Sequence, residues 1–68
     1  MESSFGKNLK RIREGRNLSM HQLARELGCN VSNICKWEKS RRYPQVIWIY
    51  RLAEVLEVNP EELVRVEK

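Results

Sequence analysis

Two short helix patterns separated by a very tight turn constrain this chain more than any other feature of its sequence. Ser19 and Gln22 have the spacing of a capping box at the start of the first helix. Gly28 ends that helix, because glycine adopts the left-handed conformation without steric cost. Asn30 follows as a favourable N-cap for the second helix. The segment 19–38 therefore predicts two helices joined by a sharp turn.

Residue size and polarity in this segment fit two helices that cross at close range. Ala24 is small at the crossing point, and Ile34 and Trp37 share one face that anchors the second helix to a core. This is a helix-turn-helix arrangement, and it predicts that the opposite face of residues 31–36 is exposed. That face carries no acidic residue, and helix N-termini favour phosphate. Its width suits a DNA major groove.

The remaining segments also predict helices, and none has the alternating pattern of a strand. Helices are expected over about residues 4–16 and 46–57. Asn59 as a cap, followed by proline, predicts a fifth helix. We therefore expect an all-α fold, a compact five-helix bundle that forms a single domain over residues 1–68.

Charge is distributed unevenly along the chain. Residues 1–51 carry 11 Lys and Arg against 4 Asp and Glu, a net charge of +7. Residues 52–68 carry 2 against 5, a net charge of −3. A basic body favours a polyanionic partner, above all nucleic acid. The alternative is an ordinary solvated surface.

Other kinds of chemistry have little support in the sequence. Cys29, Cys35 and His21 do not supply the four paired ligands of a structural zinc site. There is no nucleophile with a base and no glycine-rich phosphate loop, so we expect no catalytic residues, no cofactor and no small-molecule ligand. The thiols are expected to be buried or half-buried, although a redox switch at Cys35 is an alternative. Without a signal peptide or an apolar span, a cytoplasmic location in a bacterial or phage-infected cell is expected.

Taken together, the motif residues resemble the phage repressor/Cro family of helix-turn-helix proteins, also called the XRE type. The resemblance covers about residues 5–64 and rests on Leu18-Ser19, Leu23-Ala24, Leu27-Gly28, Ser32, Ile34, Trp37-Glu38, the basic loop to Pro44, Leu52-Ala53, Leu56, Val58 and Glu62-Leu63. It implies the lambda-repressor-like bundle and sequence-specific binding of double-stranded DNA. The implied role is a transcriptional repressor or autoregulator that binds a palindromic operator as a homodimer.

The same resemblance implies roles for individual residues. In the major groove, the base-reading residues would be Val31, Ser32 and Lys36. Phosphate contacts would come from Asn30, Asn33, Lys39, Arg41, Arg42 and Tyr43. Glu38 would pair with Arg13 as a structural contact. Met20 departs from the family pattern, which often has at this place a glutamine that contacts phosphate.

Five consecutive apolar residues, 46–50, cover every side of a helix, so some must point away from the core. One interpretation is a larger core, and the other is a self-association surface. We expect a two-fold dimer interface in the region 46–68, formed by Ile47, Trp48, Tyr50 and Val64. An alternative function is a protein-interaction module of the antitoxin or adaptor type that uses this surface, with DNA binding secondary.

Overall fold

The structure, a computed structural model, describes residues 4–39 and 43–66, and over these ranges it consists of helices and connecting turns without a strand. The helices are α1 (Phe5–Gly15), α2 (Met20–Leu27), α3 (Val31–Lys39), α4 (Val46–Leu56) and α5 (Pro60–Val64). The expected all-α fold with five helices is confirmed. Among the described helices, none combines the length and the apolarity that crossing a bilayer requires.

The two ends of α2 lie where the sequence pattern places them. The Ser19 hydroxyl accepts a hydrogen bond from the Gln22 N–H at 3.0 Å, and the Gln22 side-chain oxygen accepts one from the Ser19 N–H at 2.8 Å. Gly28 adopts a left-handed conformation with φ +80°, and its N–H donates to the carbonyl of Ala24. These caps keep the turn before α3 to three residues, 28–30.

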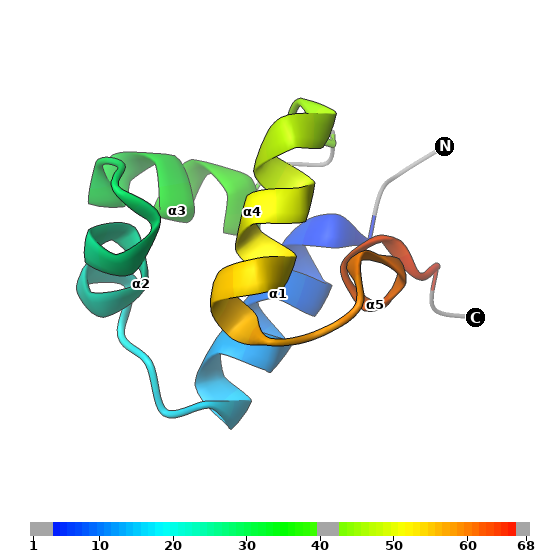
Figure 1. Cartoon of the computed structure of the whole chain (residues 1–68), viewed down its shortest axis with the longest axis horizontal. Helices are drawn as coiled ribbons and strands as arrows, with labels where there is room; N and C mark the ends of the chain where they lie inside the picture. Colours follow the sequence, from blue (N-terminus) through cyan, green and yellow to red (C-terminus); the bar gives the residue numbers. More distant parts are fainter. Residues whose placement is uncertain (1–3, 40–42, 67–68) are drawn as a thin grey trace.

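Helix α4 lies in front of α1, with α2 and α3 on one side of it and α5 on the other (Figure 1). Helix α3 packs against α1 and α2, whereas α5 packs against α1 and α4. The core between these helices consists of Phe5, Leu9, Leu23, Ala24, Leu27, Ile34, Ile49, Leu52, Ala53, Leu56 and Leu63. The helix-turn-helix pair and α5 therefore occupy opposite flanks of α4.

A fully buried amide, Asn8, joins α1 to the end of α5. Its Nδ2 donates to the carbonyls of Leu63 at 2.9 Å and Arg65 at 2.8 Å. Carbonyls at the end of a helix have no partner within the helix, so Asn8 satisfies two of them. Asn8 lies at the i+3 position from Phe5 and beside Leu9, so a polar residue on the apolar stripe of α1 was the available sequence signal, which the predictions above did not use.

Helix α1 approaches the end of α3 closely at Gly6. A Cβ atom at this position would lie 2.5 Å from the carbonyl oxygen of Glu38 and 2.8 Å from that of Trp37. Both atoms belong to the backbone, so they cannot move away as a flexible side chain would. Glycine at position 6 therefore allows α3 to pack directly on α1.

We predict that Gly6→Ala lowers the free energy of unfolding by about 1–3 kcal/mol, the usual cost of overpacking. Gly15→Ala is the matched control in the same helix, since a Cβ there meets nothing within 4 Å. That change should raise the free energy of unfolding by about 0.5–1 kcal/mol, because alanine loses less backbone entropy. Urea unfolding of both variants checks this, and equal stability of Gly6→Ala and the wild type would contradict the close packing.

Candidate nucleic-acid interface

The outward face of α3 is a stripe of three exposed side chains. Ser32, Lys36 and Lys39 are all exposed and follow one another at i, i+4 and i+7, so they share one side of the helix. Ile34, on the other side, is fully buried. The local sequence thus divides α3 into an anchoring face and a free face.

The flanks of this face are less open than the sequence analysis expected. Val31, Asn33 and Cys35 are half-buried rather than exposed. Val31 packs against the core cluster. The fully open part of α3 is therefore narrower than predicted.

One carboxylate on α3, Glu38, is removed from the free face by a buried ion pair. Its oxygens accept hydrogen bonds from Arg13 Nε at 2.6 Å and Nη2 at 3.2 Å, and Arg13 Nη1 also donates to the Leu18 carbonyl at 2.7 Å. The Glu38 side chain is 3 % exposed. The hydrogen bond with Glu38 raises the pKa of the Arg13 guanidinium, which favours its charged form. The pairing expected from the family resemblance is present.

The other phosphate contacts expected from the sequence lie around α3. Asn30 is exposed directly before the helix, and Tyr43 is exposed beyond its far end. The Tyr43 ring meets Phe5 edge-on, with centroids 6.5 Å apart. Arg41 and Arg42 fall outside the described residues.

Met20, the departure from the family pattern, is half-buried and packs against the core. Neighbouring His21 is exposed. Gln22 is exposed too, but its side-chain oxygen is engaged in the capping box. Of His21 and Gln22, His21 is the one whose side chain takes no part in the capping box at the start of α2.

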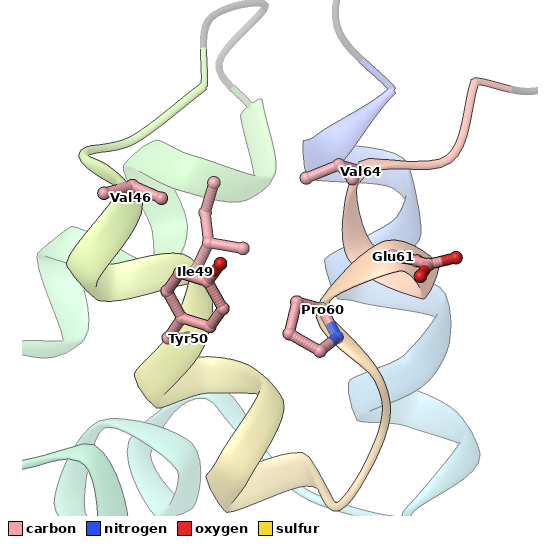
Figure 2. A pocket seen from close by; sticks show the side chains of 6 residues that line it. All are labelled: Val46, Ile49, Tyr50, Pro60, Glu61 and Val64. Carbon is pink, nitrogen blue, oxygen red and sulfur yellow. The ribbon is translucent and has the colours of Figure 1, made fainter.

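A second feature is an apolar groove of about 240 Å³ between α4 and α5. Figure 2 shows Tyr50 and Ile49 of α4 facing Pro60 of α5 across it, with Val46 and Val64 at one end. Tyr50 is 59 % exposed and Val46 is 64 % exposed. Ile47, beside them on α4, is 56 % exposed. The prediction that some of the five apolar side chains of residues 46–50 point away from the core is confirmed.

Trp48 does not join this surface. It is half-buried and packs on Trp37 of α3, with ring centroids 5.3 Å apart. Two residues along a helix correspond to about 200° of rotation, so Trp48 and Tyr50 lie on different sides of α4. Of the four residues expected at the dimer interface, Tyr50 and Val64 line the groove, and Ile47 is exposed on α4 outside the groove lining. Trp48 lies on the other side of α4 from Tyr50.

Arg51 has a structural role that the sequence analysis did not assign. Its Nη2 donates to the carbonyl of Leu27 at 3.2 Å, and its guanidinium lies 5.3 Å from the centroid of the Trp48 ring. The i, i+3 spacing of an aromatic residue and an arginine on one helix was the signal that was available.

Both cysteines are free and half-buried. Burial raises the pKa of the Cys29 thiol, against the opposing effects of the hydrogen bond with Asn33 and the charge of Arg51. Burial therefore favours the protonated form of the Cys29 thiol. Within the described residues, no group of three or more His, Cys, Asp or Glu side chains is placed to hold a metal ion.

Comparisons with known proteins give a consistent picture. A family model described as a helix-turn-helix domain matches residues 6–68. The chain is 38 % identical over 61 residues to the transcriptional repressor RghR of Bacillus subtilis, covering 88 % of this chain and 45 % of RghR. It is 31 % identical over 64 residues to the transcriptional activator BcrR of Enterococcus faecalis, covering 94 % of this chain and 31 % of BcrR. The chain thus spans less than half the length of either relative, and both are regulators rather than enzymes.

Among solved structures, the chain is similar to the restriction-modification controller protein C.AhdI from Aeromonas hydrophila. The TM-score is 0.81 at 32 % sequence identity, and the match covers 88 % of this chain and 91 % of C.AhdI. The arrangement of the five helices is therefore shared with this controller protein over nearly its full length.

We predict that Glu38→Gln lowers the free energy of unfolding by about 3 kcal/mol, because it leaves the Arg13 charge buried without a counter-charge. Arg13→Met combined with Glu38→Leu should recover most of this loss, since no buried charge remains. Urea unfolding of the single and double variants measures the coupling. A Glu38→Gln protein as stable as the wild type would show that the pair is not effectively buried.

Proposed function

Because the chain belongs to the helix-turn-helix family of transcriptional regulators, we propose that it reads double-stranded DNA by placing α3 in the major groove. This membership also agrees with the resemblance to phage repressor/Cro proteins of the XRE type. The observation that carries the proposal is the free face of α3, where Ser32, Lys36 and Lys39 are exposed and Glu38 is buried against Arg13. A cationic helix face without a competing carboxylate suits a polyanion.

Within this proposal, base reading and phosphate binding fall to different residues. Lys36 donates to guanine O6 and N7, Ser32 bonds to either type of base, and Val31 packs its exposed part against a thymine methyl. Phosphates are bound by Asn30, Asn33, Lys39 and Tyr43, together with Arg41 and Arg42 of the loop outside the described residues. Phosphate contacts fix the position of α3, and the base contacts supply the sequence preference.

We further propose that the protein acts as a homodimer on a palindromic operator. The proposed dimer face consists of the exposed residues Val46, Ile47 and Tyr50 and the half-buried Val64; all of these except Ile47 line the groove. Trp48 is left out of it, because Trp37 covers it. A single module of this type buries about 600–1,000 Å² of protein surface on DNA, so a second copy doubles the contact. It also requires two half-sites about 34 Å apart.

The proposed biological role is repression or autoregulation in the cytoplasm of a bacterial or phage-infected cell. RghR is named as a repressor and C.AhdI as a controller protein, which supports this role, while BcrR is named as an activator. Residues 1–68 would form the DNA-binding unit, with 46–68 as its dimerisation region. Occupancy of an operator that overlaps a promoter would block polymerase.

A second candidate function is that of an adaptor or antitoxin module. The observation that favours it is the same apolar surface at Val46, Ile47 and Tyr50, which suits another protein as well as a second copy. The two functions differ in their dependence on α3. Substitutions at Ser32 and Lys36 should spare the binding of a protein partner and abolish the preference for a DNA sequence.

We predict different effects from substitutions at the two types of contact, measured on the preferred duplex and on a scrambled one. Ser32→Ala combined with Lys36→Ala should reduce the ratio of specific to non-specific affinity by roughly 30-fold or more, since two base contacts are lost and each contributes about 1–3 kcal/mol. Lys39→Ala should weaken binding to both duplexes. It should also make the negative slope of log affinity against log salt shallower by about 0.9, because one phosphate contact is lost.

Titration at several salt concentrations separates these effects. Lys10→Ala is the control, because Lys10 is an exposed lysine on α1, to which no DNA contact is assigned. An unchanged affinity ratio in the Ser32/Lys36 variant would overturn the assignment of base contacts to α3.

We predict that Tyr50→Glu shifts the protein toward the monomer and weakens operator binding at the same time, because a carboxylate would be buried in the proposed dimer face. Sedimentation at micromolar concentration measures the shift. His21→Glu, at an exposed position on α2, is the control for oligomeric state. A Tyr50→Glu protein that remains dimeric would move the interface elsewhere.

A further inference from the structure

Three side chains from two helices form a continuous stack on the α3 flank of α4. The ring of Trp37 from α3 lies against the ring of Trp48 from α4, with centroids 5.3 Å apart and planes inclined by 47°. The guanidinium of Arg51, one turn further along α4, lies 5.3 Å from the centroid of Trp48. Both tryptophans of the chain thus belong to this Trp37–Trp48–Arg51 stack.

The stack also reaches the turn between α2 and α3. Arg51 donates to the carbonyl of Leu27, the last residue of α2, directly before Gly28. One side chain of α4 therefore contacts the end of α2 and the tryptophan that faces α3. Helix α3 otherwise packs on α1 and α2, so the stack joins it directly to α4.

The position of α4 gives this connection a consequence for DNA recognition. Helices α2 and α3 lie on one side of α4, and α5 lies on the other (Figure 1). The groove that adjoins the proposed dimer face lies between α4 and α5 (Figure 2). The orientation of α3 relative to α4 therefore sets the distance and angle between the two α3 helices of a dimer.

We propose that the Trp37–Trp48–Arg51 stack is a positioning element that sets which spacing of DNA half-sites the dimer accepts. The two tryptophan rings are flat and rigid and the guanidinium is planar, so the contacts of the stack resist rotation of α3 about its contacts with α1 and α2. Trp48 and Arg51 act through Trp37 and Leu27 and do not themselves contact DNA. This inference rests on the proposed function, specifically on the dimer and its palindromic operator.

The test compares binding to the preferred operator with binding to the same duplex carrying one base pair inserted between the half-sites. One base pair turns one half-site by roughly 35° relative to the other. The wild type should discriminate strongly between the two duplexes. Trp48→Ala should reduce this discrimination about three- to tenfold, the range expected from loss of one aromatic pair. Trp48→Phe should retain most of it.

Two further variants keep the experiment decisive. Val55→Ala removes a half-buried side chain from the same flank of α4 but from outside the stack, so it controls for lost stability. Arg51→Met changes an exposed residue and leaves the buried core intact, so it reports on the stack even if Trp48→Ala does not fold. It should relax the spacing preference while the salt dependence of binding stays unchanged.

Each other outcome overturns the inference in a recognisable way. A Trp48→Ala or Arg51→Met protein with the spacing preference of the wild type would show that the stack does not position α3. If Arg51→Met loses the same affinity for both duplexes, and the negative slope of log affinity against log salt becomes shallower by about 0.9, then Arg51 binds phosphate. A wild-type protein without any preference among duplexes would mean that the proposed function itself fails, and the inference with it.

Discussion

The buried guanidinium of Arg13 is the interaction on which the geometry of this protein most depends. It joins α1, the segment before α2 and the end of α3, because it binds Leu18 and Glu38 at the same time. Gly6 complements it by letting α1 approach the carbonyls of Trp37 and Glu38. Together these contacts fix α3 on α1 and remove its carboxylate from the surface. The free face of α3 is consequently cationic, and its position is defined before any DNA is bound.

Helix α4 has two different flanks, and this division connects recognition with assembly. On one flank Trp48 and Arg51 contact α3 and the end of α2. On the other flank Tyr50 borders the groove with α5, whose end is held on α1 by Asn8. In the proposed dimer, a second copy bound at the groove would therefore be connected to α3 through the contacts of α4. In such a small domain, the contacts of a few side chains fix the position of the free face of α3 relative to the two-fold axis of the proposed dimer.

The sequence was sufficient for the features that depend on local spacing. The capping box at Ser19, the left-handed Gly28 and the five helices follow from neighbours within four residues, and the structure has them. The pairing of Arg13 with Glu38 came from the family resemblance. The sequence did not predict the long-range hydrogen bonds of Asn8 and Arg51, because their acceptors are backbone carbonyls, which every residue carries. Trp48 was expected at the dimer interface with Ile47 and Tyr50, because five apolar residues in a row do not by themselves show which of them a neighbouring helix contacts.

The central claim is that the free face of α3 reads DNA sequence, twice per operator. Selection of bound duplexes from a randomised pool at about 150 mM salt tests it most directly, because weak non-specific phosphate binding fades as salt rises. The account predicts enrichment of an inverted repeat whose half-sites lie about 10 base pairs apart. A bound pool without an enriched sequence would contradict it and would direct attention to a protein partner for the surface around Tyr50.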